Sequence, residues 1–271
     1  MPPLGDLVSE ADRIMEAADS RKITLRLFGG VSFYMRCPSA KHRNLQRKYV
    51  DIDFMGYSKQ SREIKQLFPQ LGYVGRDRFN AMMGHRRLVF NDVENARRID
   101  IFLDVFEMCH KLNLKDRIGI DDRTIPLADM LATKLQIVEI NEKDIKDIMS
   151  IMIDYDVTDT DKGSINGAYL AKLCTDDWGI YKTFTMNLDR ILASLPEKDL
   201  DQGQKEIVKA KAERLRQEIE STPKSFRWKM RARVGERTVW YELPEADKEV
   251  VDSRLPGGGQ ENGGSEFDRK S

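Results

Sequence analysis

The chain has 271 residues, 33 % of them charged and 40 % apolar, which is ordinary for a globular protein with a sizeable core. Lys plus Arg and Asp plus Glu number 45 each, so no overall positive field attracts nucleic acid, and any such contact would rest on a local basic patch. The three cysteines are widely spaced and form no CxxC pair, which argues against a zinc site. The sequence has no apolar run of membrane-spanning length and no signal peptide, so we expect a cytoplasmic protein with no membrane partner.

The first part of the chain alternates between helical and strand patterns. In chain order, the patterns predict a helix at 4–18, a strand at 22–28, a short helix at 31–36, a basic loop at 41–48, a strand around 50–54, a helix at 59–69 and strands at 85–90 and 96–106. We therefore expect an α+β fold, with a small mixed sheet flanked by helices.

From residue 126 onward the apolar period changes to 3.6 residues. This predicts helices at 127–138, 145–152, 165–194 and 203–221. Residues 225–234 alternate basic with apolar side chains, which predicts a strand, and Gly235-Glu236 would turn it into a hairpin. The predicted domains are a core at 1–125, a helical domain at 126–222, a C-terminal β-hairpin extension at 223–251 and a disordered tail at 252–271.

A glycine pair and a carboxylate pair lie about twenty residues apart in the core. Gly29-Gly30, between a strand and a helix, lets backbone N–H groups approach an anion closely. Asp51 and Asp53 are two residues apart on a strand, so their side chains would project together. Neighbouring carboxylates repel each other unless a cation neutralises them. The two pairs together predict a site for a metal-bound polyphosphate.

A second acidic strand follows at Ile99-Asp100-Ile101. If it lies beside the first strand, Asp100 completes a three-carboxylate cluster with Asp51 and Asp53, although the register leaves open whether Asp100 or Asp104 is the third member. Oxygen ligands of this kind suit Mg²⁺, or Mn²⁺ in its place. Two such ions can hold an attacking oxygen and a leaving pyrophosphate in line. For any single Asp, a solvated strand edge or a surface salt bridge is the plain alternative.

In this order, the motifs resemble those of the nucleotidyltransferase superfamily, which includes DNA polymerase beta and the antibiotic nucleotidyltransferases. The segment 134–148, KLQIVEINEKDIKDI, resembles the "K…KDxxD" motif of the AbiEii/AbiGii-type abortive-infection toxins. The resemblance covers about residues 20–155 and leaves the rest of the chain unassigned. It implies a nucleotidyltransferase-fold core.

The resemblance also implies roles for individual residues. Gly29 and Gly30 would hold the nucleoside triphosphate, with Ser32 standing for the polar residue that often follows the glycines. The metal ligands would be Asp51 and Asp53, with Asp100 as third ligand or base. Lys134 would reach a phosphate, and Lys143, Asp144 and Asp147 would shape the site. Asn141-Glu142 stands where the family often has an arginine, so one basic contact is missing. The plain alternative for Lys143 and Asp147, four residues apart, is a surface ion pair.

The predicted function is a Mg²⁺-dependent nucleotidyltransferase that moves a nucleoside monophosphate from a triphosphate to a hydroxyl acceptor. The toxin resemblance implies tRNA or protein as the acceptor, growth inhibition as the outcome and a separately encoded antitoxin as partner. A small-molecule (antibiotic-type) nucleotidyltransferase and a non-catalytic nucleotide-binding protein are the alternatives. The basic residues 227–233, beside Trp240 and Tyr241, would either grip an RNA backbone or form a plain solvated strand face.

Overall fold

The computed structural model describes residues 2–242. Residues 243–251 of the predicted hairpin extension and the whole predicted tail at 252–271 lie outside the described residues. The structure is a mixed α+β fold, which confirms the predicted fold class. None of the helices described is both long and apolar enough to cross a bilayer.

The described part of the core contains a five-stranded mixed sheet with the strand order β1-β2-β5-β4-β3. The strands are β1 (Leu25–Phe28), β2 (Ile52–Gly56), β5 (Arg97–Leu103), β4 (Arg87–Asp92) and β3 (Val74–Gly75). β2 and β5 pair in parallel, and the other neighbours pair antiparallel. The two predicted acidic strands therefore lie side by side.

Helices pack on one face of this sheet to form a first apolar core. They are α1 (Leu7–Asp19) and α3 (Ser61–Gln70), while the short α4 (Asp77–Met83) packs on β4. Ile14 and Ile64 from the helices meet Phe54 and Ile101 from the strands, and all four are fully buried. Alternation along β2 and β5 sends the intervening residues, Asp53 and Asp100 among them, to the opposite face.

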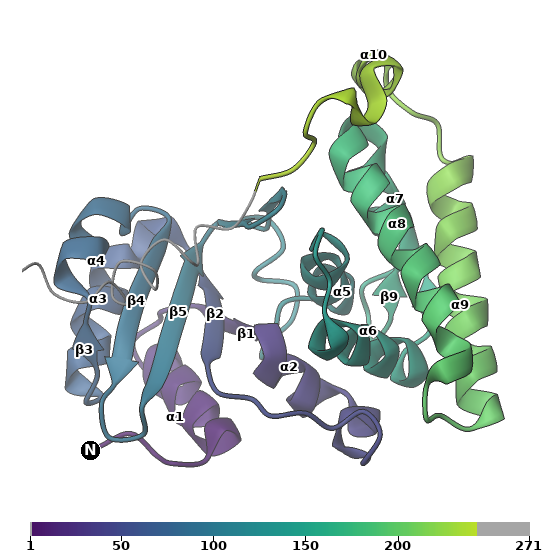
Figure 1. Cartoon of the computed structure of the whole chain (residues 1–271). Coiled ribbons are helices and arrows are strands. Elements are labelled where there is room, and N and C mark those ends of the chain that lie inside the picture. Colours follow the sequence, from purple (N-terminus) through teal and green to yellow (C-terminus); the bar gives the residue numbers. More distant parts are fainter. Residues whose placement is uncertain (1, 243–271) are drawn as a thin grey trace, which may run out of the picture.

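The opposite face of the sheet belongs to a second, larger core shared with the C-terminal helices. Phe28, Met55 and Phe106 cluster there with apolar residues of α5 (Leu127–Leu135), α6 (Glu142–Asp154), α7 (Gly167–Asp176), α8 (Trp178–Ser194) and α9 (Gln202–Ser221). α2 (Gly29–Arg36) contacts β1 and β2 on one side and α5 and α6 on the other, between the sheet and the helices (Figure 1). α2 thus occupies the junction of the two halves.

Two short strand pairs complete the connections. β6 (Val105–Glu107) and β7 (Lys111–Asn113) form a hairpin directly after β5, and β8 (Val157–Thr158) pairs in parallel with β9 (Ile165–Asn166). The predicted helix at 165–194 is therefore interrupted: it begins as β9 and is broken at Asp177, whose side chain caps α8 by accepting hydrogen bonds from the backbone of Gly179 and Ile180.

The predicted strand at 225–234 is wrong. These residues form α10 (Phe226–Val234), which lies across the ends of α7 and α8 (Figure 1). Ser225 caps the helix by accepting a hydrogen bond from the Trp228 backbone, and Trp228 packs edge-on against Tyr181 with ring centroids 5.0 Å apart. Gly235, at φ +58°, ends the helix. Capping and packing on α8 override the alternating pattern, so the predicted hairpin does not form in the part of 223–251 that is described.

Candidate functional site

Two of the three predicted carboxylates face each other across neighbouring strands. Asp53 on β2 is the register partner of Asp100 on β5, so their side chains leave the same face of the sheet at the same level. Asp100 is only 5 % exposed, and Asp53 is half-buried. Asp51 lies just before β2 and is exposed. The strand pairing therefore brings Asp53 and Asp100 together, whereas Asp51 lies outside the paired strands and is exposed to solvent.

The two paired carboxylates differ in their counterions. Asp100 forms ion pairs with Arg87 and Arg98, each with an N–O distance of 2.7 Å, and Arg87 Nε also donates a hydrogen bond of 2.8 Å to it. Asp53 accepts no hydrogen bond from residues 2–242. Burial, together with the like charges of Asp100 and Asp51, raises the pKa of Asp53 to about 7. We call Asp53 uncompensated because none of the described residues forms a hydrogen bond or ion pair with it, although the charges of Lys134 and Arg87 partly offset the rise in its pKa.

Asp104 has a structural role instead. It follows β5 with φ +61°, and its carboxylate accepts hydrogen bonds from the backbone N–H and the hydroxyl of Ser58. Asp100, not Asp104, is the acidic residue of this strand that lies opposite Asp53.

The glycine pair is α2's first two residues, and each glycine makes room for a charged side chain. Gly29 has φ +68°, and a Cβ there would lie 2.1 Å from Asp53 Oδ2. A Cβ on Gly30 would lie 2.4 Å from Nη2 of Arg47. The Asp53 carboxylate and the Arg47 guanidinium therefore both lie against the first turn of α2. Ser32 is fully buried, and its hydroxyl donates to the Gly29 carbonyl at 2.7 Å, inside the helix.

Three of the four residues predicted from the helical motif meet in one cluster, and the fourth does not. Lys134 Nζ lies 2.8 Å from Asp144 Oδ1 and 2.9 Å from Asp147 Oδ2. Arg47 binds Asp147 through two hydrogen bonds of 2.8 and 2.7 Å. We call these four residues the ion cluster. Lys143 is exposed and lies outside the ion cluster. Its backbone N–H donates a hydrogen bond to the Asn141 side chain at the start of α6.

The ion cluster adjoins the carboxylate pair. Arg47 of the ion cluster lies against Gly30, and Asp53 lies against the neighbouring Gly29. The positive charge of Lys134 also lowers the pKa of Asp53, against the larger effects that raise it. Asp144 also has a structural task, because it forms the capping box at the start of α6 with Asn141.

The carboxylates of the site match the predicted metal ions in chemistry but not in number. Within residues 2–242, no three acidic, histidine or cysteine side chains converge as a metal-binding group. Asp53 and Asp100 do fit Mg²⁺ in kind, since this ion is commonly held by one or two carboxylates while phosphate oxygens and water fill its other positions. The uncompensated charge on Asp53 agrees with such a cation.

Sequence reasoning missed the arginines of the site. Arg47, Arg87 and Arg98 pair with the predicted carboxylates, and none was predicted to do so. Arg47 belongs to the basic segment 41–48, for which the sequence predicts a loop beside the active cleft that either contacts an RNA backbone or is a plain solvated surface. The pairing of Arg87 with Asp100 follows from the antiparallel register of β4 and β5, which the sequence does not reveal.

Two neighbouring cavities lie close to the site. A cavity of about 410 Å³ adjoins Asp100, because Arg87 and Phe102 line it; Phe79, Met83 and Phe106 supply apolar walls. A second cavity of about 430 Å³ shares Glu107, Lys111 and Glu242 with the first.

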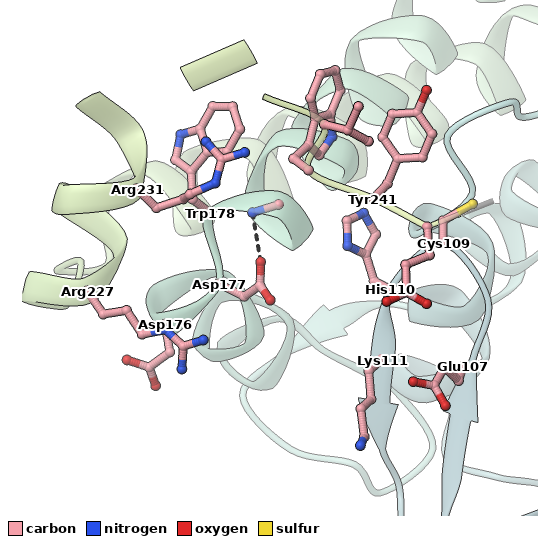
Figure 2. A pocket seen from close by; sticks show the side chains of 14 residues that line it. Glu107, Cys109, His110, Lys111, Asp176, Asp177, Trp178, Arg227, Arg231 and Tyr241 are labelled. Carbon is pink, nitrogen blue, oxygen red and sulfur yellow. Dashed lines mark hydrogen bonds between the residues drawn. The ribbon is translucent and has the colours of Figure 1, made fainter. Parts of the chain in front are cut away.

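The second cavity is bounded by aromatic rings and by charges of both signs (Figure 2). Arg231 lies over the ring of Trp178, 4.7 Å from its centroid, and donates to two backbone carbonyls that follow α10. His110, on the other side, is buried, with its Nε2 2.7 Å from the Thr183 hydroxyl. Burial lowers the pKa of His110 to about 4, so the ring is neutral at pH 7.

Comparisons with known proteins give distant likenesses. No family model matches the sequence, and no curated protein matches it by sequence. Among solved structures, the antibiotic-resistance factor ANT(2'')-Ia is similar over 52 % of this chain and 81 % of its own, with 14 % identity and a TM-score of 0.35. The lincosamide antibiotic adenylyltransferase LnuA, solved with lincomycin bound, is similar over 52 % of this chain and 94 % of its own, with 18 % identity and a TM-score of 0.39.

Proposed function

We propose that this chain is a divalent-metal-dependent nucleotidyltransferase, which transfers a nucleoside monophosphate from a triphosphate to a hydroxyl acceptor. One observation carries the proposal: Asp53 and Asp100 are in register on parallel strands, and the uncompensated Asp53 carboxylate lies against the first turn of α2. Two adjacent carboxylates next to a helix N-terminus suit a cation and the phosphates that it accompanies.

In this proposal each residue has a definite task. Asp53 and Asp100 would hold Mg²⁺ or Mn²⁺, and the exposed Asp51 would complete the ligand set when nucleotide binds. The ion would supply charge neutralisation on the phosphates and on the leaving pyrophosphate. The N–H groups at the start of α2 would face the triphosphate, and Lys134 would contact a phosphate from α5. Lys143, being exposed, would contribute a peripheral contact at most, and Asp144 and Asp147 would fix the position of Lys134.

The alternatives for the acceptor differ in size. The sequence resemblance to AbiEii-type toxins favours tRNA or protein, with growth inhibition and a separate antitoxin. The cavity of about 410 Å³ beside Arg87 favours a small molecule, because clefts that enclose small ligands have about this volume. A hydroxyl compound in that cavity would lie near Asp100, since Arg87 lines the cavity and also donates a hydrogen bond to Asp100.

A labelling experiment tests the function and separates the acceptors. The protein is incubated with Mg²⁺, α-labelled nucleoside triphosphates and, in separate tubes, total cellular RNA, lysate protein and a small-molecule extract. We expect label in one fraction, and a loss of at least 100-fold in Asp53→Asn. Asp159→Asn, a change at an exposed residue, is the matched control and should label normally. Absence of label in every fraction, or undiminished labelling by Asp53→Asn, would contradict the proposal.

A further inference from the structure

The guanidinium of Arg47 occupies a place where a cation is unfavourable for the fold alone. Its Nη2 lies over Gly30, in the first turn of α2, where a Cβ would approach it to 2.4 Å. The N-terminus of a helix carries partial positive charge, so stable proteins favour acidic residues there and not basic ones. The side chain is nevertheless only 11 % exposed. Asp147 neutralises this cation, and its guanidinium lies in the same turn of α2 as the Asp53 carboxylate, where the proposed nucleotide site begins.

Arg47 is held rigidly in this position. Nε and Nη2 donate to the two oxygens of Asp147, one hundred residues later in the chain, and the guanidinium stacks on the Tyr49 ring with 4.1 Å to its centroid. Asp147 also pairs with Lys134 at 2.9 Å. The two basic side chains therefore share one carboxylate, which holds them close together.

Arg47 still has capacity to bind a ligand. A guanidinium has five N–H groups, and the hydrogen bonds to Asp147 and to the Lys48 carbonyl use three of them within the described part of the chain. Lys143 is exposed and lies outside the ion cluster, so it supplies no buried positive charge to the site. Arg47 is placed beside Lys134, because both pair with Asp147.

We propose that Arg47 is the second phosphate-binding residue of the nucleotide site, acting beside Lys134, and that position 30 is glycine to make room for its guanidinium. This inference rests on the proposed function for its ligand, a nucleoside triphosphate. Arg47 would bind phosphate oxygens with the N–H groups left over from Asp147, and its planar fork suits that geometry better than an ammonium group would.

The test measures binding of each nucleoside triphosphate, and of the matching monophosphate, by calorimetry with Mg²⁺ present. Arg47→Ala should weaken triphosphate binding about 10- to 100-fold and change monophosphate binding less than about threefold. Asp147 keeps its partner Lys134 in this variant, so we expect it to fold; Arg47→Lys serves as a second variant and should recover part of the affinity. Arg43→Ala, in the same basic segment and exposed, is the matched control and should bind normally.

A double-mutant cycle tests the role of Gly30. A Cβ at position 30 would lie 2.4 Å from Nη2 of Arg47 and 2.9 Å from the Tyr49 ring. If Gly30 serves mainly to accommodate Arg47, Gly30→Ala should weaken triphosphate binding clearly less in Arg47→Ala than in the natural protein. If both changes weaken binding independently, Gly30 does not serve to accommodate Arg47, and that part of the inference is overturned.

The outcomes for Arg47 and for the transferase are separable. Equal loss of triphosphate and monophosphate affinity in Arg47→Ala, or no loss of either, overturns the inference even if labelling shows nucleotidyl transfer. Selective loss of triphosphate affinity without any labelling supports Arg47 and contradicts the transferase. No binding of any triphosphate by the natural protein overturns both.

Discussion

Each glycine of the pair at the start of α2 is required by a different neighbour. Gly29 faces the carboxylate of Asp53, and Gly30 faces the guanidinium of Arg47. The sequence pattern predicted that the glycines let a phosphate approach the backbone. The structure shows in addition that they let the protein's own anion and cation approach it. The pair is therefore constrained before any ligand binds.

A substitution at Gly29 tests this constraint. Gly29→Ala combines strain at φ +68° with a clash against Asp53 Oδ2, so we expect it to lower the free energy of unfolding by more than about 2 kcal/mol. Gly163→Ala is the matched control, because Gly163 has the same φ of +68° and no atom lies within 4 Å of the point that a Cβ would occupy, so it should cost only about 1 kcal/mol. Urea unfolding measures both. Equal losses would mean that Asp53 does not restrict this position.

His110 gives a prediction about pH. Burial lowers its pKa from the usual 6.5 to about 4. Between pH 6.5 and about 4, His110 is therefore protonated in the unfolded chain and neutral in the folded protein. The stability due to neutral His110 is therefore present above pH 6.5 and is lost as the pH falls to about 4. Between pH 7 and pH 5 we expect it to account for about 2 kcal/mol of the fall in unfolding free energy.

His110→Gln should remove that part of the pH dependence, while His85→Gln, at an exposed histidine, should leave it intact. Denaturant unfolding at pH 7 and pH 5 compares the three proteins. An equal fall in unfolding free energy between pH 7 and pH 5 in all three proteins would show that His110 is not the group responsible.

Among the elements, α10 shows how tertiary contacts decide between two local structures. Its basic and apolar residues alternate as in a strand, but the segment forms a helix that packs on α8. None of its residues is buried. A short helix of this kind is unstable alone and depends on its packing and its cap. Trp228 against Tyr181, and Arg231 over Trp178, supply that packing.

Removal of the Trp228 ring should therefore release α10 without unfolding the protein. In Trp228→Ala we expect amide hydrogen exchange over residues 228–234 to become at least about tenfold faster, while α9 keeps its protection. Phe226→Ala is the matched control in the same helix, since Phe226 is 79 % exposed. Unchanged exchange in Trp228→Ala would show that the cap and the helix itself suffice.

At the scale of the whole molecule, the two halves share one core. Phe28 and Met55 from the sheet pack in the same apolar cluster as Met149 and Phe184 from the helices. The predicted boundary at residue 125 falls between elements, but a large apolar surface continues across it. The predicted division into a core at 1–125 and a helical domain at 126–222 remains a prediction about folding units.

Fragments test that division. If the shared core is needed, residues 1–125 expressed alone would expose the face that carries Phe28 and Met55, bind a hydrophobic dye and show no cooperative thermal transition. The full chain, treated identically, is the control. A fragment that melts cooperatively near the transition of the full chain would show that 1–125 is an independent domain.

The sequence predicted the carboxylate site better than its counterions. Asp53 and Asp100 each interrupt an apolar alternation, so their common face could be inferred before their pairing was known. An arginine fits almost any partly exposed position, and the partner of Arg47 lies one hundred residues away, so no local pattern indicates the contact. Asp51 was placed on the strand, but β2 begins one residue later. Strand ends depend on pairing, which a single sequence fixes poorly.

The pairing of charges in the site has a kinetic consequence. Every basic side chain named in the site pairs with an acidic one: Arg47 and Lys134 pair with Asp144 or Asp147, while Arg87 and Arg98 pair with Asp100. The chain as a whole is balanced as well, with 45 charges of each sign. An anionic nucleotide therefore meets no long-range attraction, and its association rate should change by only about twofold between low and high ionic strength. Selection of the ligand would then take place after contact, through the rate at which a poorly matched molecule dissociates.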